Sequence, residues 1–172
     1  SLLGQSAKVE IIVVDDGSTD GTLKKLSIYK DIKILKQSHG GPALARNLGS
    51  SHANSGILLF VDADMIFDRE YVSTLIKPIV SGEVIGTYTT EEQVSNWDNV
   101  WARCWNVQEG WEDKKRFPKD QPRVDKRQRV EAGPPKYGTD FRAILKSEFD
   151  KVGGFDNIGY TDTWSLFNKL GV

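Results

Sequence analysis

The stretch VEIIVVDDGSTD, residues 9–20, decides the fold class of this chain. Its first half is an apolar run rich in β-branched residues and interrupted only by Glu10, which is typical of a buried strand. Its second half changes to acids, glycine and hydroxyl residues, which favour a loop and the start of a helix near residues 22–28. A buried strand followed by a polar loop and a helix indicates one unit of a layered α/β fold.

Strands and helices alternate along the rest of the chain. Further strands are expected at residues 32–35, 57–61, 84–90 and 141–145, and further helices at residues 42–55, 68–80, 94–112, about 147–152 and 161–170. Short links between alternating elements favour a Rossmann-like, mixed and mostly parallel sheet flanked by helices. In such sheets ligands bind beyond the carboxyl ends of the strands.

Composition and charge narrow the class of protein. The chain has 172 residues with 23 Lys+Arg against 24 Asp+Glu, which fits one ordinary domain and gives no global electrostatic reason to expect a nucleic acid partner. Cys104 is the only cysteine, so no internal disulfide can form and a reducing compartment is expected. The longest apolar run, residues 57–61, is far shorter than the roughly 20 residues that cross a bilayer. We therefore expect a cytoplasmic protein, or one at the cytoplasmic face of a membrane.

Two segments of the second half differ from this α/β pattern. Trp97, Trp101 and Trp105 are spaced to lie on one side of a helix, which favours a packing stripe over a stacking platform for a ligand. Residues 114–129 carry eight basic and two acidic side chains. We interpret this flexible basic loop, residues 113–130, as a solvated loop, with a mobile flap that contacts phosphates as the alternative.

Acidic residues follow two of the expected strands. Asp62 and Asp64 are separated by one residue, so their carboxylates lie on the same side of an extended segment and suit a hard divalent cation such as Mg²⁺ or Mn²⁺. Asp15 and Asp16 are expected on the same edge of the sheet. Four carboxylates in one region would raise each other's pKa, so a bound cation or a ligand donor is expected among them.

Three other residues are weaker indicators of a binding site than these acids. Arg46 lies one turn into the helix that follows Gly40-Gly41-Pro42, where it could bind phosphate together with free N–H groups, or form a surface salt bridge. We interpret His39 as a solvated loop residue and Cys104 as a packing residue.

Four segments resemble one enzyme family. VVDDGSTDGT (residues 13–22), GGPALARN (residues 40–47), LFVDAD (residues 59–64) and VGGFD (residues 152–156) are similar, in this order, to signatures of the family 2 glycosyltransferases of the GT-A fold. The resemblance is weakest over residues 94–129. It implies a single GT-A domain with a nucleotide-sugar-binding half at residues 1–90 and an acceptor-side half at residues 91–172.

The resemblance assigns the donor-binding residues. It implies that Asp16 binds the nucleobase with Asp15 beside it, in the same loop as Gly17 and Ser18. Arg46 would lie near the nucleotide. The donor would be a UDP- or GDP-linked sugar.

The resemblance also assigns the metal and catalytic residues. Asp62 would lie near the ribose and the metal, and Asp64 would bind the divalent cation, Mn²⁺ or Mg²⁺, that bridges the diphosphate. Asp162 would be the catalytic base toward the acceptor hydroxyl. Family members commonly have Glu-Asp at this place, whereas this chain has Thr161-Asp162.

The implied activity is that of a metal-dependent inverting glycosyltransferase in glycan or polysaccharide biosynthesis. Its acceptor would be a hydroxyl group or a lipid phosphate, on a glycan or a lipid-linked molecule, with peripheral membrane contact. The family's first strand and its C-terminal part are expected to lie outside these residues. The alternatives are a sugar nucleotidyltransferase, a receiver-like phosphoacceptor domain that uses Asp15, Asp16 and Asp62, and a domain that binds donor without turnover.

Overall fold

The computed structural model describes residues 1–89, 92–108, 114, 142–159 and 162–171. The chain divides into two compact units, one made of Ser1–Thr87 with Asp140–Val172 and the other of Tyr88–Thr139. The functional halves suggested by the sequence, residues 1–90 and 91–172, stay a prediction. The last segment of the chain shares a unit with the first half.

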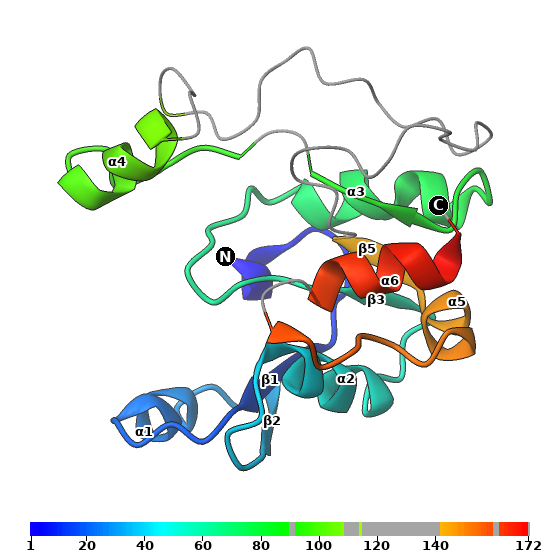
Figure 1. Cartoon of the computed structure of the whole chain (residues 1–172), viewed down its shortest axis with the longest axis horizontal. Coiled ribbons are helices and arrows are strands. Elements are labelled where there is room, and N and C mark those ends of the chain that lie inside the picture. The colour runs from blue at the N-terminus through cyan, green and yellow to red at the C-terminus, as the bar shows by residue number, and fades with distance from the viewer. Residues whose placement is uncertain (90–91, 109–113, 115–141, 160–161, 172) are drawn as a thin grey trace. The chain divides into compact units, whose positions relative to one another are not determined.

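The elements follow the expected order in the described part of the chain, and most of them are shorter than expected (Figure 1). They are η1 (Leu2–Gly4), β1 (Ile11–Asp15), α1 (Thr22–Leu26), β2 (Ile32–Lys36), α2 (Pro42–Ser51), β3 (Ile57–Leu59), α3 (Tyr71–Val80), β4 (Gly86–Thr87), α4 (Val100–Gln108), β5 (Ala143–Leu145), α5 (Lys146–Lys151) and α6 (Asp162–Leu170). Asp20 Oδ1 accepts a hydrogen bond from the Thr22 N–H at 2.9 Å, which closes a local turn directly before α1, whose N-cap residue is Gly21.

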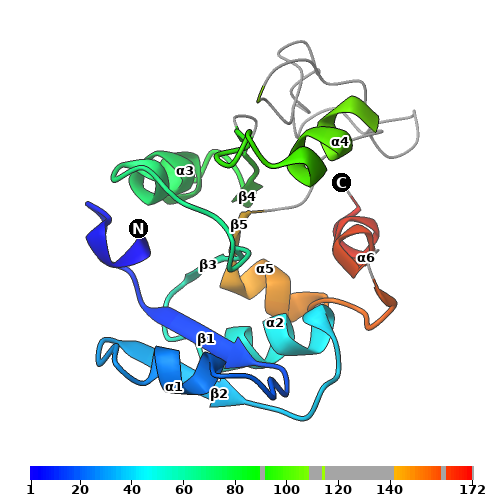
Figure 2. The same ribbon diagram turned by 90° about the vertical axis from the view of Figure 1, so that its left-hand side faces the viewer.

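The strands of the larger unit form two separate sheets (Figure 2). β1 and β2 pair in parallel, from Ile11 opposite Ile32 to Asp15 opposite Lys36. β5 lies between β3 and β4 and is antiparallel to both. The α/β architecture is as expected, and the late strand β5 provides its antiparallel part.

The first strand is less buried than its sequence indicated. Ile11–Val14 are only partly buried, and Asp15 is the one fully buried residue of β1. A cavity of about 690 Å³ lies beside this strand and is lined by residues of β1, β3, α2 and α3. The expectation of a buried strand is therefore wrong here, because one edge of β1 faces this cavity.

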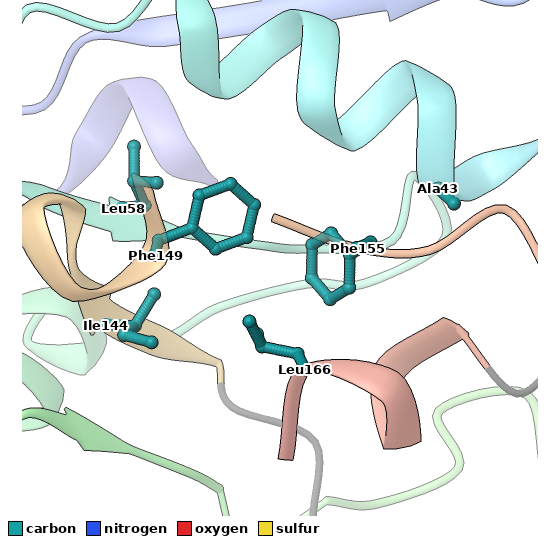
Figure 3. Packing of buried hydrophobic residues seen from close by; sticks show 6 residues of the cluster. All are labelled: Ala43, Leu58, Ile144, Phe149, Phe155 and Leu166. Carbon is teal, nitrogen blue, oxygen red and sulfur yellow. The ribbon is translucent and has the colours of Figure 1, made fainter. Parts of the chain in front are cut away.

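The main core joins α2, β3, β5, α5 and α6 (Figure 3). Its buried members are Ala43, Leu58, Ile144, Phe149, Phe155 and Leu166. The rings of Phe60, Phe149 and Phe155 form a triangle with centroids 5.0–5.3 Å apart. Burial of these rings fixes the loop after α5 against the end of β3.

The smaller unit contains α4. Trp101 on this helix is 79% exposed, so the expected packing stripe is wrong for this residue, and Trp97 precedes the helix. Cys104, expected to pack in an apolar helix, is exposed as well. The side chain of Trp105 and the basic loop, apart from Lys114, lie outside the described residues. No helix within the described ranges has the length and apolar character needed to cross a bilayer.

The VGGFD segment is held to α2 by a paired hydrogen bond. Asn47 Nδ2 donates to the Phe155 carbonyl at 2.8 Å, and the Phe155 N–H donates to Asn47 Oδ1 at 2.9 Å. Gly154 has φ +71°, and a Cβ built on it would lie 2.5 Å from Asn47 Oδ1 and 3.1 Å from the Phe149 ring. Only glycine therefore allows this close approach.

We expect Gly154→Ala to destabilise the protein more than Gly153→Ala. Both residues have positive φ, which costs alanine about 1 kcal/mol, but a Cβ at Gly153 meets no atom within 4 Å. Overpacking against Asn47 and Phe149 should add about 1–3 kcal/mol for Gly154→Ala alone. Urea unfolding of both variants measures the difference, and equal losses would contradict the close approach.

Candidate active site

The acidic residues predicted for the site lie where three elements end or begin. Asp15 is the last residue of β1 and Asp16 follows it, Asp62 and Asp64 follow β3, and Asp162 is the first residue of α6. Among the described residues, no three Asp, Glu, His or Cys side chains form a group that could hold a metal ion. Within these residues there is no ready-made cluster of three metal ligands, and the expected four-acid region stays a prediction.

Asp16 is surrounded by hydrogen-bond donors of its own chain. Oδ1 accepts from Gln37 Nε2 at 2.7 Å and from the Gly40 N–H at 2.8 Å, and Oδ2 accepts from the Gly41 N–H at 2.9 Å. His39 Nδ1 lies 3.0 Å from Oδ2. The bond from Gln37, followed by the glycine N–H groups, lowers the pKa of Asp16 from 3.8 to about 2. This direction is opposite to the mutual raising expected from neighbouring carboxylates.

Glycines allow the loop before α2 to approach Asp16. Gly41 has φ +93° and is the N-cap residue of α2, with Pro42 in the first turn. A Cβ on Gly17, which has φ +83°, would lie 3.0 Å from the His39 backbone nitrogen. Ser18, the other predicted member of this loop, is exposed. The sequence predicts a helix start here, whereas no local pattern predicts that the Gly40 and Gly41 N–H groups donate to Asp16.

Arg46 connects two of the predicted site acids. Its NH1 donates to Asp162 Oδ2 at 2.7 Å, and its NH2 lies 3.6 Å from Asp62 Oδ1. The Asp162 side chain is 3% exposed, whereas that of Arg46 is 27% exposed. This pair differs from a surface salt bridge, because a partly exposed guanidinium compensates a carboxylate that is removed from water.

Two further contacts fix Arg46 and Asp62. The Arg46 guanidinium carbon lies 5.6 Å from the centre of the Phe155 ring, which belongs to the core. Arg142 NH1 lies 3.4 Å from Asp62 Oδ2, so both oxygens of Asp62 face a guanidinium. Arg142 was not predicted as a site residue, because no signature contains it.

A chain of polar contacts positions the start of α6. Ser165 Oγ donates to the Asp162 carbonyl at 2.6 Å and accepts from the Asp156 N–H at 3.0 Å. Lys169 Nζ donates to the Gly154 carbonyl at 2.9 Å. The VGGFD segment therefore anchors the helix turn that carries Asp162. The VGGFD signature is the sequence feature that could have indicated this contact, but the resemblance assigns no role to it.

The remaining acids have different surroundings. Asp15 Oδ1 is buried without a hydrogen-bond partner in the described part of the chain. Asp64 is exposed, and it has no ion pair or hydrogen bond to another described residue. Its carboxylate is a hard oxygen donor, and Mg²⁺ or Mn²⁺ is commonly held by one or two carboxylates with water and substrate phosphates. Asp64 is thus an exposed predicted site acid whose carboxylate has no polar contact to another described residue.

Comparison with solved structures identifies the fold. The structure of residues 1–349 of TarS from S. aureus in complex with UDP superposes with a TM-score of 0.69 and 18% identity. The match covers 98% of this chain and 48% of that chain. The α/β fold predicted from the sequence is thereby confirmed.

Curated relatives are glycosyltransferases. Glycosyltransferase GlyA of Streptococcus pneumoniae is 38% identical over 96 residues, which is 51% of this chain and 14% of the relative. The uncharacterized glycosyltransferase YfnE of Bacillus subtilis is 28% identical over 178 residues, covering 92% of this chain and 43% of the relative. The chain thus spans less than half the length of these relatives. Residues 1–149 match the family model described as glycosyl transferase family 2, and the chain belongs to this family, with the GT-A fold.

Proposed function

We propose that this chain binds the donor and carries the catalytic residues of an inverting glycosyltransferase. The enzyme would transfer a sugar from a nucleoside diphosphate sugar to an acceptor hydroxyl, or to a lipid phosphate, during glycan synthesis. The observation that supports this most is the contact of one guanidinium with two acids, Asp62 after β3 and Asp162 at the start of α6. This contact brings a nucleotide-side acid and a candidate base into one site, as the family membership leads us to expect.

The loop around Asp16 would hold the nucleobase. The UDP in the TarS structure supports a nucleoside diphosphate as the donor. Three of the contacts to Asp16 come from Gln37, Gly40 and Gly41, whereas the fourth comes from His39, whose side chain is 84% exposed. A ring N–H of uracil or guanine can replace His39 at Oδ2, because an exposed side chain is free to move away.

Asp64 would hold the cation and Arg46 would face the diphosphate. A divalent cation, when bound, stabilises the negative charge that develops on the leaving nucleoside diphosphate. The two oxygens of Asp62 lie near the guanidinium groups of Arg46 and Arg142. Asp62 would accept a hydrogen bond from a ribose hydroxyl or would bind the cation together with Asp64. The planar guanidinium of Arg46 suits a phosphate oxygen as well as a carboxylate.

Asp162 would accept the proton of the acceptor hydroxyl. Attack from the face of the sugar opposite the leaving group inverts the anomeric centre and needs one base within hydrogen-bond distance of that hydroxyl. Asp162 is almost closed to solvent and bound to Arg46 in this structure. When the diphosphate competes for Arg46, one oxygen of Asp162 becomes available to the acceptor.

The alternatives predict different products. A sugar nucleotidyltransferase would release pyrophosphate from a nucleoside triphosphate, and a receiver-like domain would be labelled at one aspartate by acetyl phosphate. A domain that binds without turnover would bind UDP or GDP but transfer no sugar. Assays of the protein with UDP- and GDP-sugars, with Mn²⁺ or EDTA, distinguish these outcomes from glycosyl transfer.

We expect Asp64→Asn to weaken cation-dependent nucleotide binding. The variant removes the charge that would hold the cation, so the Kd for UDP or GDP in Mn²⁺ should rise at least about tenfold, and transfer should fall about a hundredfold, which corresponds to ~3 kcal/mol. Calorimetric titration with and without EDTA measures the binding. Asp31→Asn is the matched control, because Asp31 is an exposed carboxylate at the amino end of β2. Equal binding by both variants would exclude Asp64 as the ligand.

We expect Asp162→Asn to retain nucleotide binding and to lose transfer. The amide cannot take a proton at neutral pH, so transfer should fall by about 10²–10⁴-fold while the Kd for the nucleotide changes less than about twofold. Asp150→Asn is the control, because Asp150 forms only a surface pair with Lys146. A parallel loss of binding and transfer would assign Asp162 a structural role.

We expect Asp16 to stabilise the fold only above its folded pKa. Its pKa is about 2 in the structure and 3.8 as the reference value, so its contribution is present above about pH 4 and is lost as the pH falls toward 2. The difference in unfolding free energy between the wild type and Asp16→Asn should therefore shrink between pH 5 and pH 2.5 in urea unfolding. A difference that is constant over this range would contradict the hydrogen-bonded carboxylate.

A further inference from the structure

Arg142 is a charged residue of the site to which the proposed function gives no role of its own. Its guanidinium NH1 lies 3.4 Å from Asp62 Oδ2, and its side chain is 17% exposed, whereas that of Asp62 is 51% exposed. A guanidinium that is largely removed from water costs free energy unless carboxylates or other acceptors of the protein compensate it. The fold thus keeps a permanent positive charge beside Asp62.

The backbone of Arg142 is bonded on both sides. Its N–H donates to the Thr87 carbonyl at 2.9 Å, and its carbonyl accepts from the Phe60 N–H at 2.8 Å. Thr87 ends β4 and Phe60 directly follows β3, so Arg142 is bonded to both neighbours of the central strand β5. A side chain that starts from such a rigid element can hold its partner more precisely than one on a loop.

The alternation of side chains along β3 and β5 explains why Arg142 reaches Asp62. Leu58 lies opposite Ile144, and both are buried in the main core. Phe60 packs against the same core. Residues two apart in an extended segment share a face, which places Asp62 beyond Phe60 on this side of the sheet, and Arg142 next to Ile144. Arg142 and Asp62 are then diagonal neighbours across the pair, a separation that a long side chain can span.

Asp62 is also the first residue of a turn that carries Asp64. The Met65 N–H donates to the Asp62 carbonyl at 3.4 Å, and residues 63 and 64 form the turn between them. Because the turn starts at Asp62, a shift of Asp62 moves Asp64 as well. A group that fixes Asp62 therefore fixes both predicted site acids that follow β3.

Arg46 holds Asp62 less closely than it holds Asp162. Its NH1 is 2.7 Å from Asp162 Oδ2, whereas its NH2 is 3.6 Å from Asp62 Oδ1. In the proposed function the diphosphate of the donor competes for this guanidinium, which would draw it away from Asp62. Arg142 approaches the other oxygen of Asp62 from a different element and would stay in place. The second guanidinium would thus keep the hold on Asp62 that the first one gives up.

We propose that Arg142 is a positioning residue that acts through Asp62. Its guanidinium holds the Asp62 carboxylate, and with it the turn of residues 62–65, in place for a nucleoside diphosphate donor while Arg46 binds the diphosphate. This inference rests on the proposed function and deepens it, because it adds to the donor site a residue that no signature contains.

A double-mutant cycle in nucleotide binding tests whether Arg142 acts through Asp62. The Kd for UDP and for GDP is measured by calorimetry in Mn²⁺ for the wild type, Arg142→Met, Asp62→Ala and the double variant; methionine keeps most of the apolar stem and removes the charge. Arg142→Met should raise the Kd about tenfold in the wild type and less than about twofold in Asp62→Ala, because the residue it positions is then missing. Losses that multiply in the double variant, or an unchanged Kd for Arg142→Met, would overturn the proposal.

Two further variants separate positioning from a general loss of structure. Arg142→Lys should bind within about threefold of the wild type, because the contact with Asp62 uses a single nitrogen and a point charge can replace it. Arg69→Met is the control, because Arg69 is an exposed arginine of the same unit, and its Kd should equal that of the wild type. An Arg142→Lys protein that binds as weakly as Arg142→Met would contradict the proposal.

Hydrogen exchange tests the positioning role without any nucleotide. Arg142→Met should speed exchange of the Met65 amide at least about fivefold, because its acceptor is the Asp62 carbonyl, and should leave the Phe60 amide unchanged, because its acceptor is the Arg142 backbone. Faster exchange at both amides, or at neither, would overturn the proposal. A wild type that binds neither UDP nor GDP would contradict the proposed function, and exchange at Met65 would then decide the positioning of the turn by itself.

Discussion

The ion pair between Arg46 and Asp162 is the interaction on which the site depends. Asp162 is buried, and a buried carboxylate is tolerated only when a positive charge and hydrogen bonds compensate it. The same guanidinium approaches Asp62, so the segment after β3 and the start of α6 meet at one side chain. The two acids are brought together by α2, although they lie 100 positions apart in the chain.

The first turns of α2 organise most of the site. Gly40 and Gly41 donate to Asp16, Arg46 binds the two acids, and Asn47 holds the backbone of Phe155. Contacts from the loop before α2 and from its first turns therefore connect the loop after β1, the segment after β3 and the start of α6. This arrangement explains why the glycine-proline start and the Ala-Arg-Asn sequence occur together, since each contact needs the helix to begin at the same residue.

The order of helices and strands could be predicted from the sequence, because it depends on local patterns of apolar, capping and turn residues. The sequence did not predict which donors surround Asp16, nor that Asp162 would pair with Arg46, because these partners are 21 to 116 positions away. The spacing of apolar residues also predicted that Trp101 and Ile11–Val14 are buried. Trp101 is exposed, and Ile11–Val14 are only partly buried. In both cases burial depends on what lies beside the element, and local periodicity carries no information about that neighbour.

A double-mutant cycle on Arg46 and Asp162 tests the central interaction most directly. The unfolding free energies of the wild type, Arg46→Met, Asp162→Asn and the double variant give the coupling between the two side chains. A buried pair predicts a coupling of about 1–3 kcal/mol, with Arg46→Met the more harmful single change because it leaves the carboxylate uncompensated. A coupling below about 0.5 kcal/mol would show that the two residues act independently and would contradict this account.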